Sequence, residues 1–284
     1  TAPFCFSDTR IAATTTTTTT SHHHRDHHTQ TPANRRTNTP LSTIASAKNP
    51  RLKALRRLHR RRERERSGTF LAEGEDLIAA AELAGWRALD GYRRAGDPAG
   101  PAGFHEVEGE LLAGASTLGS GTRVLAVYEQ RWSPPAGPLC VYLHGLRDPG
   151  NVGTIIRSAH AFGASCVTLG PGCADPYGPK AVRASMGAIF TVPLARAEQL
   201  GELPGELLAL SAGAAQELRG PLQAIAPALT LLVGAERTGL PQEVLDACRR
   251  RARITIAGDS LNAAMAATVA LYELTRKPSR VRAS

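Results

Sequence analysis

The stretch that decides the fold begins with the apolar run Leu139–Leu143 and continues through Asp148-Pro-Gly-Asn-Val-Gly-Thr-Ile-Ile-Arg157. The apolar run predicts a strand, the Pro-Gly pair predicts a tight turn, and the amphipathic segment 153–162 predicts a helix. A helix that begins directly after a strand offers free backbone N–H groups to a ligand. Asn151 can donate and accept hydrogen bonds, and Arg157 is always charged, so both suit ligand binding better than core packing.

The same alternation of strands and helices continues through residues 139–277. Strands are expected at 139–143, 165–169, 189–192, 206–211, 229–233 and 252–256, and helices at 153–162, 180–186, 241–248 and 261–276. This pattern is typical of an α/β domain with a mainly parallel sheet covered by helices on both faces. Ligand-binding loops are expected at the carboxyl ends of its strands.

A second, smaller α/β domain is expected over residues 45–130, followed by a stiff, Pro-rich linker at 131–138. After Phe70-Leu71-Ala72, a helical pattern covers 75–84, strand-like runs occur near 104–107 and 124–128, and a further helix is expected near Glu110. A chain of 284 residues is long enough for two such domains, each with its own core.

The smaller domain opens with a strongly basic segment, Lys48–Arg66, which contains ten Lys or Arg residues. Leu52, Leu55 and Leu58 form one apolar stripe, which predicts a helix with one buried side and an otherwise cationic surface. We interpret this helix as an RNA contact; the alternative is a solvated surface helix. The residues expected to bind RNA are Lys53, Arg56, Arg60, Arg61 and Arg62.

Both ends of the chain differ in composition from the two domains. Residues 1–44 form a Thr- and His-rich tail that is expected to be disordered, and residues 278–284 form a basic tail. The His tract at 22–28 lacks the carboxylate or Cys framework of a structural metal site, so no functional metal site is predicted.

Charge and cysteine content narrow the class of protein. The net charge is +9 with a pI near 9.8, which fits a polyanionic partner or simply a basic enzyme. The longest apolar runs are much shorter than a bilayer span, so a membrane protein is not expected. The five cysteines form no C-x-x-C pair, which favours a reducing, cytoplasmic location.

Two further loops follow predicted strands of the larger domain. Gly234-Ala-Glu-Arg-Thr-Gly-Leu-Pro241 follows the strand at 229–233, and Ala257-Gly-Asp-Ser-Leu-Asn262 follows the strand at 252–256. Glycines let the backbone approach a ligand closely, although each loop alone could be an ordinary turn or helix cap. The spacing matches neither the dinucleotide fingerprint nor a P-loop. Since all three loops end strands of one predicted sheet, they are expected to meet.

These residues give the larger domain a specific resemblance. It resembles the SpoU/TrmH-type RNA 2′-O-ribose methyltransferases of the SPOUT superfamily, whose three motifs match the three loops in order. The segment Pro179–Phe190 is also similar to that family. Asn49–Lys53 and Phe70–Gly74 resemble its ribosomal-protein-like substrate-binding domain. The resemblance covers residues from about 45 to 276.

The resemblance implies S-adenosylmethionine as methyl donor, a ribose 2′-hydroxyl of RNA as acceptor, a trefoil knot and a homodimer. Ribosomal RNA is favoured over transfer RNA, while the target nucleotide and any link to antibiotic resistance stay open. The implied catalytic residues are Arg157, Asn151 and Glu236. The implied cofactor-binding residues are Gly234, Glu236, Gly239, Ile254, Ile256, Ser260, Leu261 and Asn262.

The chain departs from the family pattern at two positions, and the first departure leaves a rival hypothesis open. The family usually has a hydroxyl-bearing residue shortly after the Asn of its third motif, whereas Ala263 and Ala264 follow Asn262 here. Ala257 also stands where the family often has Met. A non-catalytic RNA-binding protein on the same fold is therefore the main alternative. A nucleotide-dependent enzyme acting on a small molecule is the other.

The role of Arg157 is open between two chemistries. The resemblance implies that this residue activates the hydroxyl, as a base in one version. Because a guanidinium stays protonated at neutral pH, we favour a clamp on the RNA phosphate, with a phosphate oxygen or water taking the proton.

Overall fold

The computed structural model describes residues 43–98, 100–118, 121–221, 226–258 and 260–276. The predictions for the tails at residues 1–42 and 278–284, the His tract included, lie outside the described residues. Ile44 pairs with Val107 and is only 8% exposed, so the folded part includes a residue that the sequence analysis assigned to the tail.

The smaller domain is built on a four-stranded sheet in the order β1-β4-β2-β3. β4 runs antiparallel to β1 and β2, whereas β2 and β3 run parallel. Its strands are β1 (Thr69–Glu73), β2 (Asp90–Arg94), β3 (His105–Val107) and β4 (Val124–Glu129), and its helices are α1 (Pro50–Arg57), α2 (Arg61–Ser67), α3 (Glu75–Leu83) and α4 (Gly109–Ala113). Strand β2 was not predicted, because only Gly91 and Tyr92 of its five residues are buried.

The prediction of one continuous basic helix over Lys48–Arg66 is wrong. α1 ends at Arg57, and Arg60 has an extended backbone before α2 begins. Arg64 explains the break, since its buried guanidinium donates to the carbonyl of Leu58 at 2.7 Å and pairs with Asp175 at 2.7 Å. A straight helix would place Arg64 on the turn above Arg60, where it could not reach both partners.

The larger domain holds a seven-stranded sheet in the order β7-β6-β5-β10-β8-β11-β9, with each neighbouring pair parallel. Its strands are β5 (Leu139–Leu143), β6 (Cys166–Leu169), β7 (Leu194–Arg196), β8 (Glu206–Leu210), β9 (Gln216–Glu217), β10 (Leu229–Val233) and β11 (Arg250–Arg253). Its helices are α5 (Pro149–Ala161), α6 (Pro179–Ala184), α8 (Gln242–Ala247) and α9 (Ala263–Thr275), with short 3-10 turns η1 (Ala188–Phe190) and η2 (Leu200–Glu202). The expected α/β class with a parallel sheet is confirmed.

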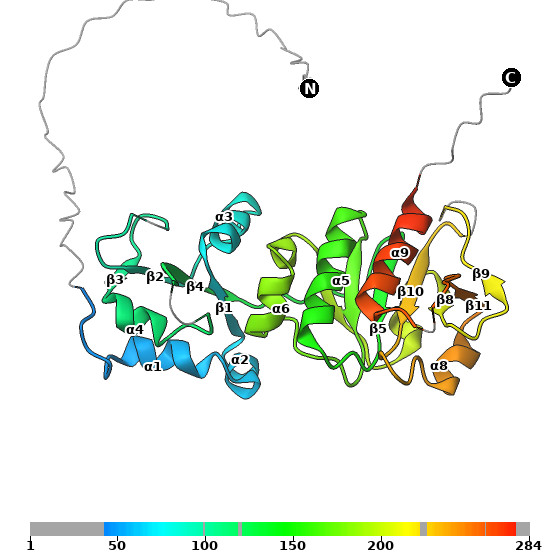
Figure 1. Ribbon diagram of the computed structural model, residues 1–284, viewed down its shortest axis with the longest axis horizontal. Helices are drawn as coiled ribbons and strands as arrows, with labels where there is room; N and C mark the ends of the chain where they lie inside the picture. Colours follow the sequence, from blue (N-terminus) through cyan, green and yellow to red (C-terminus); the bar gives the residue numbers. More distant parts are fainter. Residues whose placement is uncertain (1–42, 99, 119–120, 222–225, 259, 277–284) are drawn as a thin grey trace, which may run out of the picture. The chain divides into compact units, whose positions relative to one another are not determined.

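Helices cover the sheet on both faces because β5 and β10 are buried along their whole length. Val141 points to the face where Ile155 of α5 and Ala267 of α9 pack. Tyr142 points to the opposite face, with Val244 of α8. Figure 1 shows α5 and α9 side by side in front of the central strands. This packing holds the amino ends of both helices at the carboxyl edge of the sheet.

Two predicted strands have different outcomes in the structure. Residues 189–192 are not a strand: η1 covers part of them, because the carbonyl of Phe190 accepts the indole N–H of Trp86 at 2.7 Å. The strand expected at 252–256 is β11 and ends at Arg253, because its neighbour β8 ends at Leu210. Ile254 and Ile256 are therefore left outside the ladder.

The segment expected to be a linker is bonded at several points. The backbone N–H of Arg131 donates to the hydroxyl of Tyr177 at 3.0 Å, and that hydroxyl donates to the carbonyl of Arg131 at 2.5 Å. The N–H of Ser133 donates to the carbonyl of Leu194 at 2.8 Å. Pro-rich composition predicts the absence of regular structure here, but it does not reveal these contacts.

Among the described residues, the helices are all too short or too polar to cross a membrane. The same residues include no group of His, Cys, Asp or Glu placed to hold a metal ion.

Candidate active site

Loops from two neighbouring strands form the centre of the site. β5 and β10 run parallel, with Leu143 paired to Val233, so both chains leave the sheet at the same edge. The first loop enters α5 through Asp148, whose side chain accepts the N–H of Gly150 at 3.1 Å and caps the helix. Pro149 occupies the first helical position, for which its fixed φ is suited, so α5 starts four residues before the predicted start.

The second loop is held in a tight form by two backbone hydrogen bonds between Ala235 and Gly239, of 3.2 and 2.9 Å. A Cβ on Gly234 would lie 2.3 Å from the carbonyl carbon of Gly239, so only glycine fits there. Gly239 has a φ of +66°, which also favours glycine. The closed loop fixes the direction in which Glu236, Arg237 and Thr238 leave the backbone.

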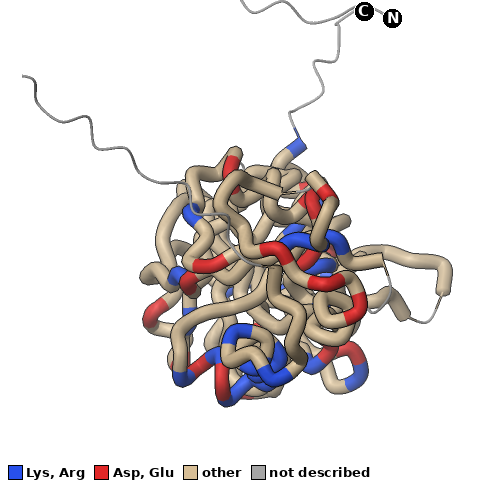
Figure 2. The backbone as a smooth tube through the Cα atoms, turned by 90° about the vertical axis from the view of Figure 1, so that its left-hand side faces the viewer, with Lys and Arg blue, Asp and Glu red and all other residues tan. Residues whose placement is uncertain are grey.

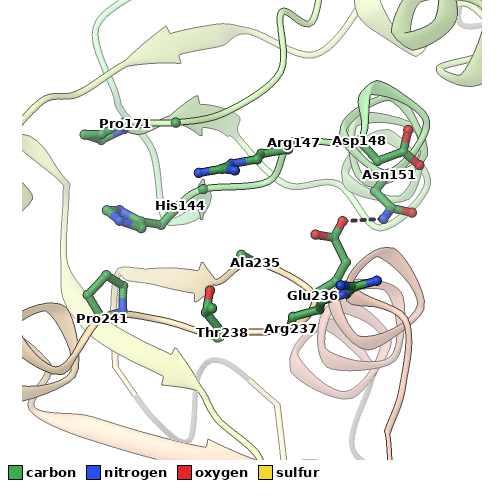
Figure 3. Close-up of a pocket in the computed structure, with 13 residues that line it drawn as sticks. His144, Arg147, Asp148, Asn151, Pro171, Ala235, Glu236, Arg237, Thr238 and Pro241 are labelled. Carbon is green, nitrogen blue, oxygen red and sulfur yellow. Dashed lines mark hydrogen bonds between the residues drawn. The ribbon is translucent and has the colours of Figure 1, made fainter.

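Three side chains join the three predicted loops to one another. Asn151 of the first loop donates to Glu236 of the second at 2.6 Å, and Figure 3 shows this contact. Asn262 of the third loop donates to the Oδ1 atom of Asn151 at 3.2 Å. The Oδ1 atom of Asn262 also accepts the N–H of Ala264 at 2.9 Å and so caps α9. The structure thus brings together three side chains that lie 85 and 111 residues apart.

One hollow at this edge of the sheet gathers most of the residues predicted to bind the cofactor. Its lining includes Gly234, Glu236, Gly239, Ile254, Ile256, Ser260 and Leu261. The eighth predicted residue, Asn262, lies next to Leu261 and caps α9. Ile254 and Ile256 reach the hollow because β11 ends before them. The lining combines aliphatic side chains with a carboxylate and a hydroxyl, which suits an adenosine-like group that carries a positive charge.

A larger hollow, of about 1090 Å³, lies beside the first. Ala235, Glu236 and Gly239 line both hollows, so the glycine loop is the wall between them. His144, Arg147, Asn151 and Arg237 also line the larger hollow, among other residues, and Figure 3 shows their arrangement. Sequence reasoning missed His144, Arg147 and Arg237. Their only signal was their position within the loops that end β5 and β10.

The ion pair at the start of α5 is the clearest electrostatic feature of the larger hollow. Lys180 of α6 donates to Asp148 at 2.6 Å. This hydrogen bond, together with the N–H of Gly150, holds the pKa of the Asp148 carboxyl below its usual range. Asp148 is therefore an anion at neutral pH, and its charge already has a partner.

Arg157 is not placed in either hollow of its own chain. It lies on α5 two turns beyond Asn151, and its side chain is exposed. A six-residue spacing puts the two side chains on different faces of a helix, so they do not meet. The structure therefore separates Arg157 from the cluster of Asn151 and Glu236.

The five basic residues predicted to bind RNA have different surroundings. Lys53, Arg60 and Arg62 are exposed, whereas Arg56 donates to the carbonyls of Gly114 and Ala47 and so has a structural contact. Arg61 pairs with Glu65 at 2.8 Å. Figure 2 shows Lys and Arg gathered along the lower edge of the view, where Figure 1 places α1 and α2, with acidic residues between them.

The comparisons with known proteins agree with this geometry. The model of the SpoU rRNA Methylase family matches residues 138–272, which include all three loops, and that of the MRM3-like substrate binding domain matches residues 49–91. The 23S rRNA (uridine(2479)-2′-O)-methyltransferase of Streptomyces viridochromogenes is 32% identical over 281 residues, which cover 86% of this chain and 96% of that protein. The chain belongs to the SpoU rRNA methylase family.

Two further relatives extend the likeness across both domains of this SpoU-family chain. The 23S rRNA (guanosine(2553)-2′-O)-methyltransferase of Bacillus subtilis is 29% identical over 82% of this chain and 99% of its own length. The crystal structure of an AdoMet-bound rRNA methyltransferase from Sinorhizobium meliloti is 32% identical, with a TM-score of 0.72. It covers 81% of this chain and 96% of its own. The fold implied by the resemblance is confirmed; the trefoil knot stays an expectation.

Proposed function

We propose that this chain transfers a methyl group from S-adenosylmethionine to a ribose 2′-hydroxyl of ribosomal RNA. The observation that carries this proposal is the chain of hydrogen bonds from Glu236 through Asn151 to Asn262. These bonds join the three loops of the family pattern at the wall between two hollows. One hollow suits the cofactor, and the larger one has room for a nucleotide.

The cofactor belongs in the smaller hollow. When bound, S-adenosylmethionine supplies an activated methyl group on a positively charged sulfur. Ile254, Ile256 and Leu261 provide aliphatic surface for the adenosine, and the Ser260 hydroxyl provides a hydrogen-bonding group. Glu236 supplies negative charge on the shared wall, and its hydrogen bond to Asn151 fixes the position of its carboxylate.

We assign Arg157 to the RNA rather than to the cofactor. A guanidinium stays protonated at neutral pH and is therefore a poor proton acceptor. A clamp on a phosphate holds the ribose hydroxyl in line with the methyl group, and alignment of this kind contributes on the order of 7–11 kcal/mol at best. Because Arg157 lines neither hollow of its own chain, we propose that it serves the site of a second copy.

A homodimer would bring that second copy into place, and α9 offers a surface for it. Met265, Val269 and Tyr272 are 61, 42 and 56% exposed and lie at helical spacing on one face. α5 packs against α9 through the hydroxyls of Ser158 and Thr268, 2.6 Å apart. Arg157 directly precedes Ser158, whose partner Thr268 is next to Val269 of the apolar stripe. We propose that the stripe packs against a second copy of the chain.

The rival hypothesis of a non-catalytic RNA-binding protein rested on the missing hydroxyl after Asn262. Ala263 is 6% exposed, and Asn262 caps α9 without help from a following side chain. Calorimetry with S-adenosylmethionine separates the two hypotheses: the proposed function requires binding, whereas a protein that has lost the chemistry on this fold would not bind the cofactor.

Methylation mapping tests the function directly. Ribosomal RNA from cells with and without the gene is compared for 2′-O-methyl sites, and purified chain with tritiated cofactor should restore the missing site. Transfer RNA from the same cells is the control. A methyl group found only in transfer RNA would show that the substrate is wrong, and unchanged maps of both RNAs would contradict the activity.

We also propose a cytoplasmic location. Cys140, Cys166, Cys173 and Cys248 are buried and unpaired by disulfides, and Cys140 and Cys166 face each other across β5 and β6. Free cysteines this close together are typical of proteins from a reducing compartment.

A further inference from the structure

Two arginines of the larger hollow have no side-chain partner among the residues that the structure describes. In the part of the molecule that the structure describes, Arg147 and Arg237 make no side-chain hydrogen bond or ion pair, and both are exposed. The two carboxylates of the hollow are, by contrast, already bonded: Asp148 to Lys180, and Glu236 to Asn151. The hollow therefore has positive charge available for an anionic ligand.

The positions of the two arginines follow from the strand register. Leu143 at the end of β5 pairs with Val233 at the end of β10. Arg147 and Arg237 each come four residues after those strand ends, so two neighbouring loops present one guanidinium each. Figure 3 shows Arg147 extending toward His144 and Pro171, while Arg237 lies below Glu236, on the side of Asn151. The two charges thus lie on different sides of the hollow and suit two separate phosphates.

The side of the hollow near Arg147 continues toward the basic helix α2. Pro171 and Gly172 line both this hollow and an adjoining one of about 260 Å³. Arg61 of α2 and Arg196 line the adjoining hollow, and the Arg196 guanidinium lies 4.0 Å above the ring of Trp132. Asp175 and Glu198 also line it, so its cations are partly offset. A nucleic-acid strand that leaves Arg147 past Pro171 therefore meets further Arg side chains.

We infer that Arg147 and Arg237 bind the two RNA backbone phosphates on either side of the target nucleotide. The ribose between those phosphates then faces the Asn151–Glu236 pair at the wall shared with the cofactor hollow. Guanidinium groups suit this task because they present a planar set of donors to phosphate oxygens. The inference rests on the proposed function, and it names the residues that hold the RNA.

The salt dependence of RNA binding tests the inference without requiring turnover. The probe is in vitro transcribed large-subunit ribosomal RNA, and its affinity for the full chain is measured at several salt concentrations. Each lost phosphate contact lowers the slope of log affinity against log salt by about 0.7 on single-stranded RNA. Arg147→Ala and Arg237→Ala should each lower it by that amount, and the double variant by about 1.4.

The control is Arg249→Ala, since Arg249 is also exposed and without a hydrogen bond or ion pair among the described residues, but lines neither hollow. It should leave the slope unchanged. Arg147→Lys and Arg237→Lys should restore most of the slope, because they keep the charge. Binding of S-adenosylmethionine, measured by calorimetry, should stay the same in all variants.

An unchanged slope in the double variant would overturn the inference, as would a Lys variant that behaves like the Ala variant. These outcomes do not depend on methylation. If the wild-type chain methylates no ribosomal RNA but the slopes change as expected, the phosphate contacts stand and the proposed function fails. If the wild type methylates ribosomal RNA and the slopes do not change, the function stands and these contacts are wrong.

Discussion

Arg157 and the residues around the cofactor should have separable effects. We predict that Arg157→Ala lowers methyl transfer about 100-fold, because a misplaced acceptor costs that much, while cofactor affinity changes little. The reason is that Arg157 lines neither hollow of its own chain. The measurement is incorporation of tritiated methyl groups, with calorimetry of cofactor binding in parallel. The matched control is Arg249→Ala, which should turn over normally. Normal turnover by Arg157→Ala would show that Arg157 takes no part in methyl transfer.

Gly234 should be intolerant of a single added methyl group. In Gly234→Ala the new Cβ would meet the carbonyl carbon of Gly239 at 2.3 Å, so the glycine loop must move. Overpacking of this kind costs about 1–3 kcal/mol. The free variant can avoid this cost by moving the loop, but cofactor binding requires the loop in its original position. The cofactor affinity should therefore fall by about 5- to 150-fold. Gly201→Ala is the control, since a Cβ there meets nothing within 4 Å. Equal cofactor affinity in both variants would contradict this account.

Asp148 should contribute a small, pH-dependent part of the stability. Its pKa is lowered by Lys180 and the Gly150 N–H, so its contribution is present above the unfolded pKa and lost as pH falls through the folded pKa. Its side chain is 43% exposed, which limits the ion pair to about 0.2–1 kcal/mol. In Asp148→Asn, stability at neutral pH should fall by that amount, and the difference should shrink as pH falls below about 4 and vanish below the lowered folded pKa. Denaturation midpoints across this pH range measure it; a constant difference at all pH values would disprove it.

The residues of the site divide into those that a sequence pattern can indicate and those that it cannot. Asn151, Glu236 and Asn262 stand in loops that end predicted strands, and such loops gather at one sheet edge, so their meeting could be predicted. Arg147 and Arg237 stand in the same loops, but whether a guanidinium has a partner depends on tertiary contacts. The separation of Arg157 from the hollows depends on which side of α5 faces the site.

At the scale of elements, α9 carries a surface whose role can be tested. We predict that Val269→Asp weakens the proposed dimer, because a charge would be buried in the apolar stripe that also contains Met265 and Tyr272. Sedimentation of the full chain over a range of concentrations measures the oligomeric state. The control is Leu83→Asp, since Leu83 is 91% exposed and belongs to α3. If the wild-type chain sediments as a monomer, the proposed dimer does not form.

The elements that sequence patterns predicted well are those whose burial is uniform. β5 and β10 are buried at every position, so their apolar runs identify them. The helix boundaries in the basic segment before β1 were harder to predict. The break between α1 and α2 depends on the contact of Arg64 with Asp175, which lies 111 residues away. The apolar run 189–192 belongs to a 3-10 turn because Phe190 packs on Trp86 with ring centroids 5.2 Å apart. Long-range partners of this kind leave no local periodicity.

At the scale of the whole molecule, the relatives show that the architecture does not name the target. Proteins named for a guanosine and for a uridine of 23S rRNA are similar to this chain over most of its length. Likeness to both proteins over most of this chain's length therefore does not decide between the two nucleotides. The larger hollow is lined mainly by the first two loops, whereas the basic surface of α1 and α2 lies outside all three.

A site shared between two copies predicts that two impaired variants can restore each other at a cofactor concentration too low to saturate the Gly234→Ala chain. We predict that Arg157→Ala chains, which keep the cofactor hollow, recover activity when co-expressed with Gly234→Ala chains, which keep Arg157. In a two-fold dimer each mixed pair has one site with both functions, so isolated mixed dimers should reach about half of wild-type activity. Different affinity tags isolate the mixed dimers, and methyl transfer to ribosomal RNA is measured. Each variant co-expressed with itself is the control. Mixed dimers without activity would place Arg157 in the site of its own chain.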